Sequence, residues 1–99
     1  MDIKDAFAAA LKRARTAKRL TQEDFSNVSS RTYVSTLERG LKNPTLDKIE
    51  DLASVMRLHP LTLITLAYMI ERNDINLEFK DPQELFKVVT KELSQLALL

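Results

Sequence analysis

The chain has 99 residues, of which 44% are hydrophobic, and its 15 Lys/Arg and 14 Asp/Glu give a formal net charge of +1. Because it contains no cysteine and one histidine, disulfides and thiolate zinc sites are excluded, and we expect no metal and no cofactor. No apolar run is long enough to span a membrane and the first residues lack the apolar run of a signal peptide, so we expect a cytoplasmic protein without a membrane contact.

The positive charge is concentrated in the first part of the chain. Residues 1–57 carry eleven Lys/Arg and eight Asp/Glu, whereas residues 58–99 carry four and six. The segment 12–19, KRARTAKR, holds five cations and no acid. This distribution permits a nucleic-acid partner but does not require one.

The apolar spacing predicts helices and no strands, since no stretch shows period-two alternation between turn residues. Residues 2–18 predict a first helix, whose apolar face holds Ile3, Phe7, Ala10, Leu11 and Ala14. Thr21 then predicts the start of a short second helix, QEDFS, with Asp24 as its partner in a capping box.

A third helix is predicted from Arg31 to about Arg39, after a turn and N-cap at Ser29-Ser30. Gly40, the single glycine of the chain, follows it directly. A left-handed residue at a helix C-terminus is least costly for glycine, so Gly40 predicts an abrupt end to this helix.

Three further helices complete the prediction. Thr45 caps a fourth helix carrying Leu46, and Pro60 begins a fifth over about 60–71. A polar connector at 73–81 leads to a last helix over 82–98, which Asp81 and Pro82 begin.

The third helix has an unusual outward side. At about 100° per residue, Tyr33, Val34 and Leu37 fall together on the apolar side. The opposite side is polar, with a cation at each end, and consists of Arg31, Thr32, Ser35, Thr36 and Arg39. Short hydroxyl side chains permit close approach, and Arg, Ser and Thr contact base edges and phosphates. The pattern by itself leaves open a helix that reads nucleic acid or one that merely faces solvent.

The sequence from LKRAR through LTQEDF to YVSTLERGLKNPTLDKIEDLA resembles the Cro/repressor (XRE-type) helix-turn-helix family over roughly residues 3–69. Its most specific parts are LTQE at 20–23 and STLERG with PTL at 35–46. The resemblance implies an all-α, five-helix lambda-repressor-like DNA-binding domain at 1–70, followed by a connector and an additional C-terminal helix at 71–99. It also implies a two-fold dimer on its operator, with the third helix in the major groove.

The resemblance assigns roles to individual residues. The positions that match base-reading residues are Arg31, Thr32, Ser35 and Thr36. Those that match phosphate contacts are Gln22, Arg39, Lys42 and Asn43, and Gln22 also matches a residue that braces the third helix. Arg15 and Glu38 match a partly buried salt bridge between the first and third helices.

Two positions depart from the family pattern. The link FSNVSSR before the third helix is shorter than usual and lacks a glycine, which predicts a shorter second helix or a tighter turn. Arg19 stands where the family often has glycine, either near the phosphate path or merely in solvent.

The last helix carries an apolar stripe that must be covered, made of Leu85, Phe86, Val89, Leu93 and Leu96. It could pack on its own domain as a sixth core helix, or form a two-fold dimer interface. We expect dimerisation, since operator binding gains from coupling two half-sites. The fifth helix is the family's usual dimer surface and could also serve.

These observations predict a sequence-specific transcriptional regulator, most simply a repressor, which binds a pseudo-palindromic site on double-stranded DNA as a homodimer. The alternative is an antitoxin-type module that neutralises a toxin partner through its tail and autoregulates by binding DNA. We find no catalytic constellation in the sequence and expect no enzyme.

Overall fold

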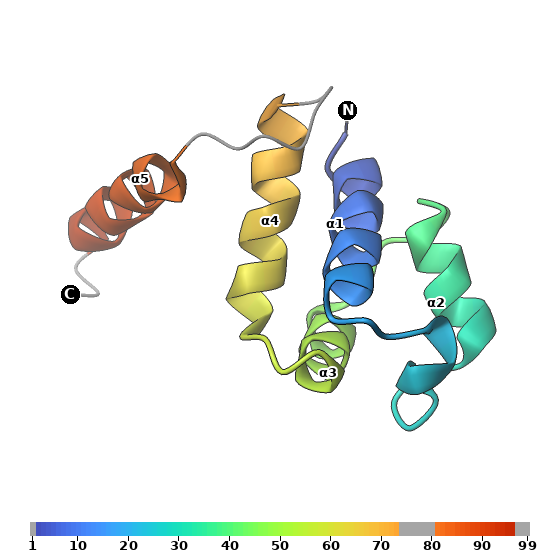
Figure 1. Cartoon of the computed structure of the whole chain (residues 1–99). Helices are drawn as coiled ribbons and strands as arrows, with labels where there is room; N and C mark the ends of the chain where they lie inside the picture. The colour runs from blue at the N-terminus through green and yellow to red at the C-terminus, as the bar shows by residue number, and fades with distance from the viewer. Residues whose placement is uncertain (1, 74–80, 97–99) are drawn as a thin grey trace.

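The structure, a computed structural model, describes residues 2–73 and 81–96 and is all-helical over these ranges, as the sequence predicts (Figure 1). Most of the expected connector at 73–81 and the end of the expected last helix therefore lie outside the described residues. The elements in chain order are α1 (Ile3–Ala17), the 3-10 helix η1 (Gln22–Phe25), α2 (Arg31–Glu38), α3 (Leu46–Val55), α4 (Pro60–Asn73) and α5 (Pro82–Gln95).

The helix starts follow the capping residues of the sequence. The Ser30 hydroxyl accepts the Tyr33 backbone N–H at 3.0 Å, and the Thr45 hydroxyl accepts that of Lys48 at 3.1 Å. The Asp81 carboxylate caps α5 in a similar way. Each cap satisfies a backbone N–H that has no partner within its helix, so the predicted starts of α2, α3 and α5 are confirmed.

Three helices end on a residue in the left-handed region, namely Arg19 (φ 59°), Gly40 (φ 72°) and Arg57 (φ 56°). The Gly40 N–H donates to the Leu37 carbonyl at 3.0 Å, and the N–H of residue 41 donates to the Thr36 carbonyl at 3.2 Å, which is a Schellman end. A Cβ at position 40 would lie 2.6 Å from the Asp5 carboxylate on α1. Gly40 therefore allows both a sharp helix end and the close approach of α1.

The core forms where α1 packs along α4, with α2 against α1 and α3 against α4 (Figure 1). Its largest fully buried side chains are Leu11, Phe25, Val34, Leu37, Leu52, Met56, Leu63 and Ile70. Burying a side chain of this size is worth about 1.5–3 kcal/mol. Two residues assigned to apolar faces, Ile3 and Leu46, are instead 43% and 76% exposed, because each lies at the first position of its helix, at the edge of the core.

The shortened link before α2 is accommodated by a very short second helix. η1 is a single turn of four residues, and the Asp24 carboxylate accepts the Thr21 N–H at 2.7 Å. Phe25, the last residue of this turn, is fully buried. The turn is thus fixed at its start by a cap and at its end by the core.

α5 adds no buried residue to the core. Phe86, Val89 and Leu96 are 40%, 41% and 69% exposed, and in Figure 1 the helix stands beside α4 rather than within the bundle. The alternative of a sixth core helix is therefore not seen in the single chain, and the apolar stripe of α5 is left largely uncovered.

Candidate nucleic-acid interface

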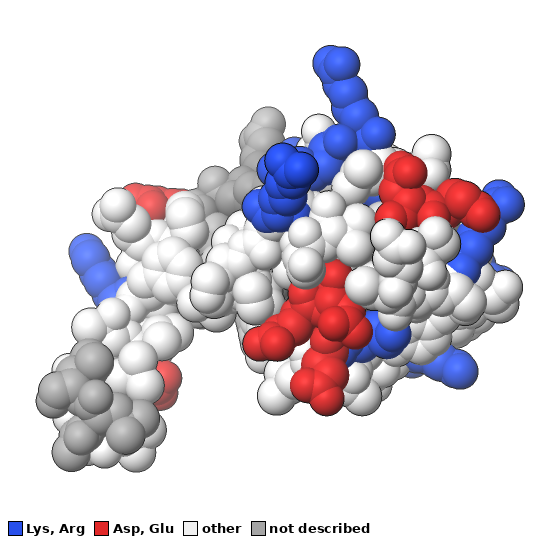
Figure 2. Space-filling model, turned by 90° about the horizontal axis from the view of Figure 1, so that it is seen from below, with Lys and Arg blue, Asp and Glu red and all other residues white. Residues whose placement is uncertain are grey.

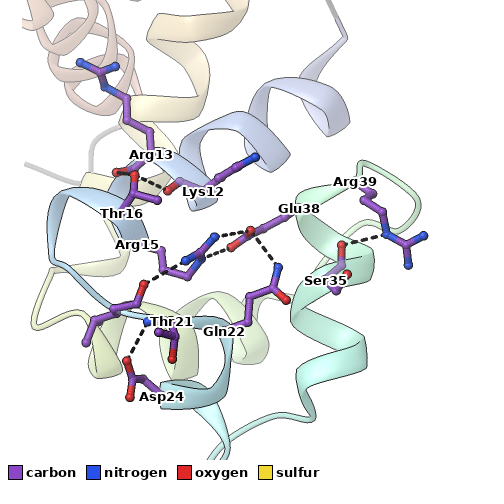
Figure 3. Close-up of polar contacts among 11 residues, drawn as sticks. Lys12, Arg13, Arg15, Thr16, Thr21, Gln22, Asp24, Ser35, Glu38 and Arg39 are labelled. Atoms are coloured by element: carbon purple, nitrogen blue, oxygen red, sulfur yellow. Dashed lines mark hydrogen bonds and ion pairs between the residues drawn. The ribbon is translucent and has the colours of Figure 1, made fainter.

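A polar cluster ties η1 and α2 to α1 (Figure 3). Arg15 of α1 donates through Nε and Nη2 to the two carboxylate oxygens of Glu38 on α2, at 2.6 and 3.0 Å. Its Nη1 donates to the Leu20 carbonyl at 2.9 Å, and the Gln22 amide donates to Glu38 at 3.1 Å. The cluster thus fixes the position of η1 and α2 relative to α1.

The Arg15–Glu38 pair is largely withdrawn from solvent, with side chains only 13% and 4% exposed. The hydrogen bond to Glu38 raises the pKa of Arg15 above its ordinary value, and the nearby negative charge adds to the effect, while burial opposes it. Arg15 is therefore charged at neutral pH, and the two side chains satisfy each other's hydrogen-bonding groups, as a partly buried ion pair requires.

The four residues expected to read bases lie together on the outer side of α2. Arg31 and Thr32 are exposed, and Ser35 and Thr36 are half-buried one turn further on. Residues four apart in a helix stack on one face, so Arg31 with Ser35 and Thr32 with Thr36 form two adjacent rows. The Thr36 hydroxyl donates to the Thr32 carbonyl at 2.8 Å, which leaves its oxygen free to accept.

The residues expected to contact phosphates surround this surface unevenly. Arg39 and Lys42 are exposed just after α2, and the Arg39 Nε donates to the Ser35 carbonyl at 3.3 Å. Gln22 lies on the opposite flank, on η1. Asn43 is exposed and borders a groove shared with the start of α1 and with α4.

The sequence did not single out Lys48, which braces the link before α2. From α3, its Nζ donates to the Val28 carbonyl at 2.9 Å and lies 5.3 Å from the centre of the Tyr33 ring. Lys42 lies over the same ring at 6.0 Å. A contact between residues so far apart in the chain leaves no local pattern in the sequence that could have predicted it. Partial burial of a lysine, which is uncommon, becomes visible only in the structure.

Charge is distributed unevenly between the faces of the molecule. Figure 2, seen from below Figure 1, shows one group of acidic side chains near the middle of that face and another toward its upper right, with Lys and Arg side chains around them. α3 carries three exposed acids, Asp47, Glu50 and Asp51. The outer side of α2 holds no acid between Arg31 and Arg39, so it is the more suitable surface for a polyanion.

The described residues offer neither a metal site nor a single helix that could span a membrane. Residues 2–73 and 81–96 hold no group of three acidic or histidine side chains that could bind a metal ion. Within the same ranges no single helix is long and apolar enough to cross a membrane, and only α3 with α4, bent by 104°, reach that length and composition together.

Comparison with known proteins agrees with this architecture. The family model described as helix-turn-helix matches residues 11–63, more than half of the chain. The uncharacterised HTH-type transcriptional regulator y4dJ of Sinorhizobium fredii is 36% identical over 67 residues, covering 66% of this chain and 87% of that protein. No solved structure matches. The chain therefore belongs to the XRE-type helix-turn-helix family of DNA-binding transcription regulators.

Proposed function

We propose that the protein is a cytoplasmic repressor that binds a pseudo-palindromic operator as a homodimer, with α2 in the major groove. Arg31, Thr32, Ser35 and Thr36 contact base edges. Gln22, Arg39, Lys42 and Asn43 contact the phosphate backbone on either side. The base contacts supply sequence preference and the phosphate contacts supply affinity and register.

The observation that carries this proposal is the outer side of α2. It presents three short hydroxyl side chains, Thr32, Ser35 and Thr36. Arg31 lies at one end and Arg39 at the other, with no acid between them. A helix that needed only solubility would not require this composition, whereas base edges require small donors and acceptors at close range. The cluster of Arg15, Glu38 and Gln22 behind α2 holds this surface rigidly in place.

The dimer is proposed from α5 and the outer side of α4. Leu85, Phe86 and Val89 border a groove whose other wall includes Leu61 and Tyr68 of α4. Both α4 residues are about half exposed, at 51% and 47%. A second copy that covers this surface would couple two half-sites, and the exposed stripe of α5 (with Leu93 and Leu96) supports that arrangement.

The test is a binding selection from a random duplex library at near-physiological salt. We expect an enriched inverted repeat with half-site centres about one DNA turn apart. Enrichment of a single half-site would contradict the proposed dimer, but it would still support base reading by α2. Salt-sensitive binding without any enriched sequence would contradict the base-reading role of α2.

A further inference from the structure

An acidic residue, Glu23, lies beside Arg31 at the N-terminal end of α2. Glu23 on η1 places Oε2 3.7 Å from Nη1 of Arg31, the first residue of α2. The side chains are 70% and 73% exposed, so the ion pair stabilises the fold by no more than about 1 kcal/mol. Holding the fold together therefore does not explain a carboxylate at this position.

The position of Glu23 is unfavourable for a protein that binds a polyanion. Glu23 and Arg31 border one polar hollow together with Arg15, Thr21 and Gln22. Arg15 is already paired with Glu38, and Gln22 is a proposed phosphate contact. A carboxylate beside phosphates is repelled unless a cation neutralises it, and repulsion grows when the interface excludes water. The cost is avoided only in complexes where Arg31 stays paired with Glu23.

The geometry of the pair leaves Arg31 able to read a base while it remains paired. Arginine has five N–H donors in a planar fork, and Glu23 lies at Nη1. The edge formed by Nε and Nη2 is then directed away from the carboxylate, and such an edge matches O6 and N7 of guanine. The carboxylate favours orientations of the guanidinium that keep Nη1 toward Glu23.

We propose that Glu23 is a specificity-determining residue, which positions Arg31 for guanine and penalises binding wherever Arg31 must leave it for a phosphate. This inference rests on the proposed base-reading function of α2. On random DNA, Arg31 satisfies a phosphate only by exposing Glu23 to the backbone, so non-specific complexes are weakened. On the operator both groups are satisfied at once.

The experiment compares wild type, Glu23→Gln, Arg31→Ala and the double variant on three duplexes: the selected operator, operators with single-base changes, and random DNA. Glu23→Gln keeps the shape of the side chain and removes its charge. We expect its discrimination at one base pair per half-site to fall about three- to ten-fold, at the same position that Arg31→Ala affects. Binding to random DNA should tighten. The slope of the logarithm of the binding constant against the logarithm of salt concentration should become steeper by about one unit.

The control is Glu50→Gln, which makes the same charge change on an exposed acid of α3, outside the helix-turn-helix. It should leave base discrimination unchanged. In the Arg31→Ala background, Glu23→Gln should have no further effect on discrimination, because its role acts through Arg31. Circular dichroism of each variant verifies that the fold is retained.

The outcomes separate the two proposals. If the wild type selects a clear operator and Glu23→Gln discriminates among bases as well as the wild type does, the proposed role of Glu23 is overturned. The proposed function is then unaffected. Loss of discrimination at a base pair that Arg31→Ala does not affect overturns the positioning role as well. A wild-type protein with no sequence preference overturns the proposed function, and the role of Glu23 with it.

Discussion

Arg15 and Glu38 each take part in three hydrogen bonds of the polar cluster behind α2. Arg15 is bonded to Glu38 through two nitrogens and to the Leu20 carbonyl through a third, and Glu38 also accepts from Gln22. A buried pair of this kind contributes modestly as a pair, but removing one partner leaves the other charged and unsatisfied. Stability and the placement of α2 therefore depend on the same few atoms.

We predict that Glu38→Ala destabilises the protein by about 3 kcal/mol, because it leaves the partly buried Arg15 guanidinium without its carboxylate acceptor. Chemical denaturation measures the loss. Glu23→Ala, which breaks the exposed pair with Arg31, should cost no more than about 1 kcal/mol. Similar losses in both variants would show that the Arg15–Glu38 pair is no more important than a surface ion pair.

The pH dependence of the same pair has a defined sign. The pKa of Arg15 is raised above its ordinary value, so the folded chain holds the proton more tightly than the unfolded chain does. A raised pKa contributes stability that is fully present below the unfolded value and is lost only as the pH rises through the folded value. Titration of Arg15 therefore causes no loss of stability at neutral or mildly alkaline pH.

The left-handed helix ends differ in how well their residues suit them. Arg19 has φ 59° and carries a Cβ in a conformation that costs a non-glycine residue about 1–2 kcal/mol. We predict that Arg19→Gly stabilises the protein by roughly 0.5–1 kcal/mol, since the relief of strain exceeds the greater freedom of glycine in the unfolded chain. Gly40→Ala should do the reverse, because it adds strain at φ 72° and displaces the Asp5 carboxylate. Thermal unfolding tests both predictions. A lower melting temperature for Arg19→Gly than for the wild type would contradict the claim that Arg19 is strained.

At the scale of the elements, most of the helices could be predicted from the sequence. Capping residues fix the starts of α2, α3 and α5, and a single glycine fixes the end of α2, because these signals act within one turn of chain. The all-helical content followed from the apolar spacing. The five-helix DNA-binding arrangement followed from the resemblance carried by LTQE at 20–23 and STLERG with PTL at 35–46. These local rules explain why the predicted and observed bounds agree closely for α1, α2 and α4.

The remaining features depend on contacts that no local pattern records. Helical periodicity does not distinguish an α-helical turn from a 3-10 turn in four residues, so η1 was expected only as a short helix. The contact between Lys48 and the Val28 carbonyl joins residues twenty positions apart. The apolar stripe on α5 predicts that another surface packs against this helix, but the pattern does not identify that surface. The roles of Arg31, Thr32, Ser35 and Thr36 stay predictions.

We predict that Lys48→Met loosens the link between η1 and α2. The change removes the donor to the Val28 carbonyl, and a hydrogen bond from a charged group is worth about 1.5–3 kcal/mol. The free energy of unfolding and the preference for operator over random DNA should both decrease. Lys42→Met is the matched control, since Lys42 lies over the same Tyr33 ring. Lys42→Met should weaken binding to operator and random DNA alike, with little effect on stability. If Lys48→Met showed the same result, Lys48 would not brace the link between η1 and α2.

At the scale of the whole molecule, the protein combines a rigid domain with a helix whose apolar side is uncovered. α1 to α4 share one core, whereas α5 buries none of its residues. A second copy would cover α5 and bring two α2 helices to successive turns of DNA, so assembly and operator binding should be coupled.

We predict that Val89→Asp, which places a charge in the apolar stripe, converts the protein to a monomer in sedimentation velocity. Operator affinity should then fall by about 100-fold or more, through loss of coupling between half-sites. Thr90→Asp adds the same charge to the same helix outside the stripe and should remain dimeric. A Val89→Asp protein that sediments as a dimer would assign dimerisation to another surface.

The central claim is that the outer side of α2 reads base sequence, and Arg31→Ala tests it most directly. Titrations of the selected operator and of random duplex at one salt concentration give two affinities for wild type and variant. We predict a loss of about 1–3 kcal/mol on the operator and a clearly smaller loss on random DNA, so that the ratio of the two affinities decreases. Equal losses on both duplexes would mean that Arg31 contacts only phosphates, and the claim that this surface reads bases would be contradicted.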